Sequence, residues 1–227
     1  MRGLVFVIVA WALCGGLAAC GGGETGASSD SEKHTRASAG PQLGRPETVR
    51  AQANIFGAGR HELPPSPGGG GSGVKLPGWR LPEGSGRVVT IPSATGRVIP
   101  IVEEGVDNGP EGDGVGPSDV YSWHGISGII HRHNGMFLVG VFLGDDPPET
   151  DAPRRLNFTK RERFESLAPQ LGQTFFIGDG RGRSYEVPSE ATRLFLGFAD
   201  AYRYVGNPGW YGNNAGKLKV TVEMTSR

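Results

Sequence analysis

Cysteine is nearly absent from this sequence. The 227 residues include two cysteines, Cys14 and Cys20, and both lie at the start of the chain. The rest of the chain therefore has no disulfide and must be stabilised by a hydrophobic core. An excess of charge of either sign is also lacking, because 23 acidic and 23 basic side chains balance. The composition gives no support to a protein that binds nucleic acid through a strongly basic surface.

Long apolar runs are lacking as well. Leu4–Leu13 is too short to span a bilayer, and it is followed by the residues Leu-Ala-Ala-Cys at 17–20. These four residues resemble the lipobox of bacterial lipoproteins, in which the cysteine is lipidated. The resemblance implies a signal peptide at 1–19, a lipid anchor on Cys20 and, with Gly21 next, sorting to the outer membrane of the cell envelope. An ordinary secretory signal with an incidental cysteine is the alternative.

Glycine and proline, in contrast, are abundant, with 39 and 17 residues. Such a composition is typical of turn-rich β proteins. Residues 20–73 consist mostly of glycine, serine, alanine, proline and charged residues, with one apolar cluster at Ala53–Phe56. A segment of this kind buries too little apolar surface to offset its ordering entropy, so we predict a disordered, flexible stalk. The folded domain is expected at 74–227.

The remaining sequence predicts short strands separated by turns. Lys217–Met224 alternates strictly between apolar and polar residues, and Arg193–Phe198 is a nearly continuous apolar run, typical of a strand buried on both faces. A turn at Ser93–Gly96 is expected to separate two strands, and Thr159–Ala168 has the capping spacing of a short helix. The fold class predicted is all-β, an antiparallel β-sandwich. The other expected strands are Val88–Ile91, Val98–Val102, Trp123–Ile130, Met136–Leu143 and Gln173–Ile177.

The loop between the last two strands concentrates oxygen ligands. Asp200, Asn213 and Asn214 supply a carboxylate and two amides within a glycine- and proline-rich segment. Calcium prefers six to eight such oxygens, so the loop is a candidate calcium site. The alternative is that both asparagines adopt turn conformations and bond to their own backbone.

The same loop resembles a known family. Phe198-Ala-Asp200, then Pro-Gly-Trp-Tyr-Gly-Asn-Asn-Ala-Gly at 208–216, is similar to the calcium-binding loop of the bacterial galactophilic (PA-I type) lectins. The resemblance implies a galactose-binding-like β-sandwich of the jelly-roll type. It also implies that Asp200, the carbonyl of Trp210, Asn213 and Asn214 hold Ca²⁺, with a further carbonyl from the loop after Val98–Gly105. A sugar, a galactoside in that family, would complete the shell at Asp200, Trp210 and Asn213.

A second match concerns the sugar. His124–Ile130 is similar to a family segment in which a histidine and a glutamine contact the ligand, and here His124 fits while Ser127 replaces the glutamine. The chain also departs from the family, with six extra residues at 201–206 and tryptophan at 210 where the family has threonine. Aromatic side chains around the loop are able to stack on a sugar or to fill the core. We expect Tyr211 to be buried and either Tyr202 or Trp210 to form an exposed platform.

Other chemistry has less support. His131 and His133 are spaced to share one strand face, for which a solvated face is favoured over a metal site. Asp145, Asp146 and Asp179 are acids of the kind found in surface turns, and no serine elbow or phosphate loop occurs. We therefore predict a protein that is not an enzyme, namely a calcium-dependent carbohydrate-binding envelope lipoprotein. A structural or adhesin-like envelope domain that binds no sugar is the alternative.

Overall fold

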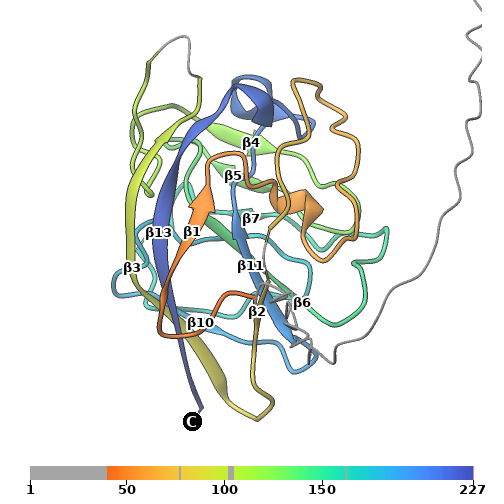
Figure 1. Cartoon of the computed structure of the whole chain (residues 1–227), viewed down its shortest axis with the longest axis vertical. Helices are drawn as coiled ribbons and strands as arrows, with labels where there is room; N and C mark the ends of the chain where they lie inside the picture. Colours follow the sequence, from red (N-terminus) through yellow and green to blue (C-terminus); the bar gives the residue numbers. More distant parts are fainter. Residues whose placement is uncertain (1–39, 77, 102–104, 162, 227) are drawn as a thin grey trace, which may run out of the picture. The chain divides into compact units, whose positions relative to one another are not determined.

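The computed structural model describes residues 40–76, 78–101, 105–161 and 163–226, and most of their regular structure is β-strand (Figure 1). The largest sheet has five strands in the order β1-β13-β3-β10-β8. A second sheet of four strands has the order β2-β11-β6-β9, and a third has the order β12-β4-β5-β7. The strands of the first sheet are β1 (Pro46–Arg50), β3 (Arg87–Ile99), β8 (Ser166–Leu167), β10 (Ser184–Glu186) and β13 (Ala215–Ser226).

The other elements are short. The second sheet contains β2 (Gly78–Arg80), β6 (Val139–Leu143), β9 (Phe175–Phe176) and β11 (Arg193–Gly197). The third contains β4 (Ser118–Val120), β5 (Ile129–His131), β7 (Leu156–Asn157) and β12 (Val205–Gly206). The 3-10 helices are η1 (Ile55–Gly57), η3 (Tyr202–Tyr204) and η4 (Tyr211–Asn213). The all-β prediction is confirmed, but the sheets are not purely antiparallel, because β8–β10, β4–β12 and β5–β7 pair in parallel.

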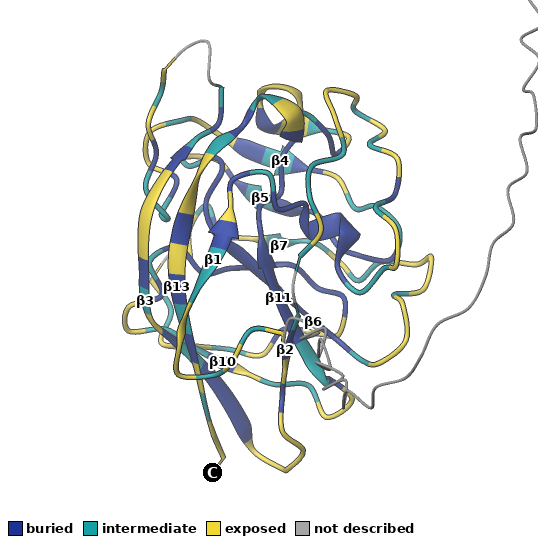
Figure 2. Ribbon diagram, viewed as in Figure 1, coloured by how far each residue is buried: buried dark blue, intermediate teal, exposed yellow. Residues whose placement is uncertain are grey.

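The two strands beside the candidate loop have the predicted character. In β13 the side chains of Leu218, Val220 and Val222 are completely buried, and the residues between them are more exposed (Figure 2). Strand β11 lies between β2 and β6 and is buried along most of its length, as its apolar run predicts. Alternation fits a strand with one wet face, whereas a continuous apolar run fits a central strand with both faces covered.

The turn predicted at Ser93–Gly96 is wrong. These four residues continue the thirteen-residue strand β3 and pair with the 218–221 segment of β13. The local turn preference is overridden because β13 supplies a full-length partner, and the ladder accommodates one register shift between Thr221 and Glu223. Pro100 comes just after the strand and does not interrupt it.

The stalk predicted to extend to residue 73 ends earlier. Residues 46–50 form β1 and pair with β13, and the Ala53–Phe56 cluster is buried in the core. The Asn54 side chain caps η1 by accepting from the backbone N–H of Phe56, and the backbone of Ile55 donates to the Phe198 carbonyl at 3.2 Å. The apolar cluster noted within residues 20–73 therefore belongs to the folded domain and not to the stalk.

The predicted signal peptide, the lipidated Cys20 and the first part of the stalk lie outside the described residues. Among the residues described, no helix has the length and apolar content needed to cross a bilayer.

Two smaller expectations also fail. Within the described part of 159–168 there is no helix, and Phe164 instead packs against Phe158 and Tyr185. His131 is not on a solvated face, because it is fully buried between Phe137 and Phe176, and its Nδ1 accepts from the backbone N–H of Asn134 at 3.1 Å.

We expect Ile55→Val to lower the free energy of unfolding by about 1 kcal/mol, because it deletes one fully buried methylene group from the core. His61→Ala, in the exposed part of the same segment, is the matched control and should leave stability unchanged. Denaturant titration of both variants measures this. Equal stability of Ile55→Val and the wild type would contradict the inclusion of residues 46–60 in the domain.

Candidate metal centre

The loop that follows β11 is closed on itself before β13 begins. The backbone N–H of Gly209 donates to the Asp200 carbonyl at 3.0 Å, and an isolated β-bridge joins Ala201 to Pro208. These contacts fix the base of the segment 201–206, which carries η3. The six residues that depart from the lectin pattern therefore form a closed excursion, and they leave Asp200 and the 208–214 turn next to each other.

The Asp200 carboxylate is enclosed by this loop and is only 2% exposed. Its Oδ1 accepts from the backbone N–H of Ala201 at 2.7 Å, and its Oδ2 accepts from the Asn214 side-chain amide at 2.8 Å. The Tyr211 hydroxyl accepts from the Asp200 backbone N–H and donates to the Phe198 carbonyl. Burial raises the pKa of Asp200 to about 7, and the two hydrogen bonds to the carboxylate oppose that rise only in part.

Two amide oxygens beside this carboxylate have no donor. The Oδ1 atoms of Asn213 and Asn214 are both buried, and neither accepts a hydrogen bond from any described residue. In the orientation described, the Asn214 amide nitrogen donates to Asp200 and the amide oxygen lies on the opposite side of that group; turning the amide over would present the oxygen to the Asp200 side instead. Buried oxygens without a donor are rare in native proteins and call for a bound ion or water. The loop thus presents one carboxylate and two unsatisfied carbonyl-type oxygens.

A hollow of about 320 Å³ opens beside Asp200. Pro100 and Ile101, which follow β3, form part of its wall together with Asn213. The structure therefore brings the end of β3 to the loop. Within the described residues no group of three or more histidine, cysteine, aspartate and glutamate side chains converges. The full lining is Pro100, Ile101, Asp200, Ala201, Tyr202, Arg203, Tyr204, Trp210 and Asn213.

Backbone strain is concentrated around the same hollow. Arg203, Tyr204 and Trp210 have φ values of 51°, 64° and 69°, in the left-handed region that side chains rarely adopt. Each such residue costs about 1–3 kcal/mol, and strain of this kind often marks a ligand-binding segment. The Tyr202 and Trp210 rings lie 4.8 Å apart, and Tyr202 is 54% exposed. Tyr211 is completely buried, as expected. Trp210 is only partly exposed, so Tyr202 is the exposed aromatic residue at the rim.

Residues 68–70, in the glycine-rich segment that was predicted to be flexible, form hydrogen bonds with the loop. The backbone N–H groups of Trp210 and Gly212 donate to the carbonyls of Gly69 and Gly70 at 2.7 and 2.8 Å. The Trp210 indole N–H donates to the Gly68 carbonyl at 2.8 Å. The glycines contribute only main-chain carbonyls to these contacts, so no side-chain pattern within 68–70 predicts them, although a cluster of glycines able to adopt positive φ is the available signal.

The structure does not bring the predicted sugar ligands His124 and Ser127 to this hollow. His124 is in a two-residue hairpin turn closed by hydrogen bonds between Trp123 and Ile126, and it lines a different hollow of about 530 Å³. Ser127 is fully buried, and its hydroxyl accepts from the backbone N–H of Thr174 at 2.8 Å. A short sequence match does not determine where a hairpin packs.

The acids considered for hydrolysis are likewise separated. Asp145 and Asp146 line a hollow of about 500 Å³ that does not include Asp179. Asp145 forms an ion pair with Arg80 at 3.2 Å, whereas Asp179 forms one with Arg183 at 3.3 Å. These carboxylates have separate structural partners and do not form a pair.

The chain was compared with family models, with curated proteins and with solved structures, and none of them matches it. The site therefore has to be interpreted from its own geometry.

Proposed function

We propose that this protein is a calcium-dependent carbohydrate-binding domain of the galactose-binding-like type, with its site at the Asp200 loop. The observation that carries the proposal is the pair of buried, donor-free Oδ1 atoms of Asn213 and Asn214 beside the buried Asp200 carboxylate. A cation at this position would satisfy the Asn213 oxygen and would offset the cost of burying the ionised carboxylate. It would also satisfy the Asn214 oxygen once that amide turns over, so that its oxygen rather than its nitrogen faces Asp200.

Calcium is the cation that suits these donors. It takes oxygens from carboxylates, amides and backbone carbonyls at flexible geometry, and it binds six to eight of them. Asp200, Asn213 and Asn214 would supply side-chain oxygens, and the carbonyls of Trp210 and of the segment after β3 would add to them. A loop with one carboxylate cannot fill the shell, so positions remain for ligand hydroxyls.

A glycan fits the remaining positions. Two neighbouring sugar hydroxyls would complete the calcium shell, while the exposed Tyr202 ring, packed against Trp210, offers a surface for the apolar face of a sugar. Binding of this kind changes no covalent bond, and the cation acts by orienting the sugar. A galactoside is the first sugar to test, because the loop resembles that of the galactophilic lectins.

The same proposal includes export and anchoring. Leu-Ala-Ala-Cys at 17–20 supports cleavage after residue 19 and lipidation of Cys20, which would hold the domain at the bacterial outer membrane. The tether would then begin at Cys20 and end near Gly40, where the described domain starts.

The test is calcium titration of the purified protein, followed by calorimetry and by thermal unfolding. Calcium at about a hundred times its Kd is expected to stabilise the protein by about 2.7 kcal/mol, which raises the melting temperature by several degrees. Asn213→Ala together with Asn214→Ala should abolish the effect. Asn207→Ala, which changes an exposed asparagine of the same loop outside the hollow, should preserve it.

No calcium binding by the wild type would refute the metal centre. Calcium binding without any response on a glycan array would refute the carbohydrate part alone, and would favour a structural or adhesin-like envelope domain.

A further inference from the structure

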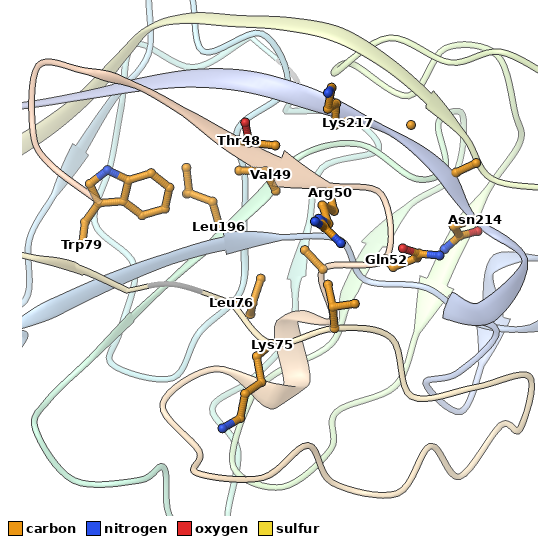
Figure 3. A pocket seen from close by; sticks show the side chains of 14 residues that line it. Thr48, Val49, Arg50, Gln52, Lys75, Leu76, Trp79, Leu196, Asn214 and Lys217 are labelled. Atoms are coloured by element: carbon orange, nitrogen blue, oxygen red, sulfur yellow. The ribbon is translucent and has the colours of Figure 1, made fainter. Parts of the chain in front are cut away.

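A further hollow, a groove of about 840 Å³, lies beside the edge strand β1 (Figure 3). Figure 3 shows Trp79 at one end of the groove and Gln52 with Asn214 at the other. The buried or partly buried apolar side chains that line it come from β1, from β11, from β2 and from the segment that leads into β2. They are Val49, Val74, Leu76, Trp79 and Leu196.

One edge of β1 faces this groove. In the described part of the chain β1 is the first strand of its sheet, and β13 is its one strand partner there. The backbone N–H of Ala51, just after β1, donates to the carbonyl of Gly216 in β13 at 3.1 Å. Because hydrogen-bonding directions alternate along a strand, Val49 faces β13 while Thr48 and Arg50 face outward. The Arg50 carbonyl accepts from Ala53. Among the residues that the structure describes, nothing else bonds to the Thr48 N–H and C=O or to the Arg50 N–H, and these groups are the ones that an added strand would use.

The edge already pairs with an extended segment just beyond this point. The backbone N–H of Val74 donates to the Gln52 carbonyl at 2.8 Å, and Ala53 and Val74 form a parallel bridge. The chain then leaves the edge, continues past Lys75 and enters β2. Thr48 and Arg50 are therefore a continuation of an edge whose geometry is suited to strand pairing.

The groove is cationic, although the chain as a whole has no net charge. Arg50, Lys75 and Lys217 line it, and none of the described lining residues carries a carboxylate. Arg50 is directly opposite Lys217, which is directly opposite Arg97 on β3. Arg97 is paired with Asp107, whereas no ion pair among the described residues engages the three lining cations. Like charges directly opposite one another destabilise a sheet, so this row has an energetic cost in the free protein.

We propose that this groove binds an extended acidic peptide segment of a partner protein, which adds to β1 as an extra strand. Its backbone would pair with Thr48 and Arg50. Its side chains would alternate, with apolar residues facing the groove floor and acidic residues facing Arg50, Lys75 and Lys217. The free backbone edge favours a peptide over other polyanions, because a peptide carries amide donors and acceptors at strand spacing. Asn214, which the proposed calcium centre uses, also lines one end of this groove, but none of the residues substituted in the test below belongs to that centre.

The test uses a capped peptide of about eight residues, an ordinary strand length, in which glutamate and valine alternate. Binding to the purified protein is measured by calorimetry at low and high salt. Thr48→Pro removes the outward N–H at a position where edge strands tolerate proline, and Thr48→Val keeps it. We expect Thr48→Pro to weaken binding at least tenfold and Thr48→Val to bind like the wild type. Lys217→Thr should weaken binding and raise the melting temperature, since it relieves the repulsion with Arg50.

A second probe does not depend on how Thr48→Pro folds. The same peptide, N-methylated at the amides that would face β1, should not bind the wild-type protein. The proposal is overturned if the plain peptide does not bind, or if the N-methylated peptide binds equally well. It is also overturned if vesicles of phosphatidylglycerol bind in a Lys217-dependent manner while the peptide does not, because the cationic row would then serve a lipid surface.

Discussion

Replacing Gly70 with alanine is expected to lower the free energy of unfolding by about 2–5 kcal/mol and to weaken calcium binding at the Asp200 loop. Gly70 has a φ of +66°, which costs a side chain about 1–2 kcal/mol. A Cβ atom there would also lie 2.6 Å from the Trp210 ring and 2.7 Å from its Cα. Relieving that overlap costs about 1–3 kcal/mol more and displaces Trp210, whose neighbours form the proposed metal centre.

The adjacent glycine provides the matched control. Gly69 has a φ of +77°, but a Cβ atom there would meet nothing within 4 Å. Gly69→Ala should therefore cost only the backbone contribution of about 1–2 kcal/mol and should leave calcium affinity unchanged. Denaturant unfolding in a chelator and calorimetric calcium titration separate the two effects. If Gly70→Ala and Gly69→Ala have the same free energy of unfolding and the same calcium affinity, the packing of residues 68–71 against Trp210 does not position the loop.

Elements that reveal themselves through side-chain patterns were predicted, and elements that depend on main-chain pairing were not. The alternation in β13 and the apolar run of β11 identify both strands, because burial alone sets those patterns. The continuity of β3 through Ser93–Gly96 depends on β13 lying beside it, which no local sequence encodes. The contacts of the glycine-rich segment 68–71 could not be predicted for the same reason, since this segment contributes only backbone groups to them.

The candidate centre shows the same division. Asp200, Asn213 and Asn214 were singled out as oxygen ligands, and the structure brings Asp200 and Asn214 into direct contact. A short local match predicted His124 at the same site. In the structure His124 lies in a separate hairpin, and its backbone carbonyl accepts from the Arg60 guanidinium. Residues close together in sequence share a loop geometry that a motif captures, whereas distant residues meet only through the packing of the whole sheet.

The calcium-free protein is expected to lose stability as the pH rises from about 4 to about 7, and Asp200→Asn should remove that loss. Burial raises the pKa of Asp200 to about 7 from an ordinary value of 3.8. Over this range the unfolded chain releases the Asp200 proton while the folded chain retains it, so rising pH favours unfolding. A rise of this size corresponds to at most about 4 kcal/mol. Below about pH 4 both states hold the proton, so the loss of stability is absent. Above about pH 7 both states release the proton, and the loss is complete.

Calcium should reverse the trend, because it binds the ionised carboxylate and must displace the proton at low pH. Its affinity is expected to fall about tenfold for each pH unit below about 7. Unfolding of the wild type, Asp200→Asn and the exposed control Asp113→Asn, each with chelator and with calcium, measures both effects. If, in chelator, Asp200→Asn loses as much stability with rising pH as Asp113→Asn does, the buried carboxyl is not the source of that loss. If calcium stabilises the wild type equally at about pH 5 and about pH 8, the metal does not bind at Asp200.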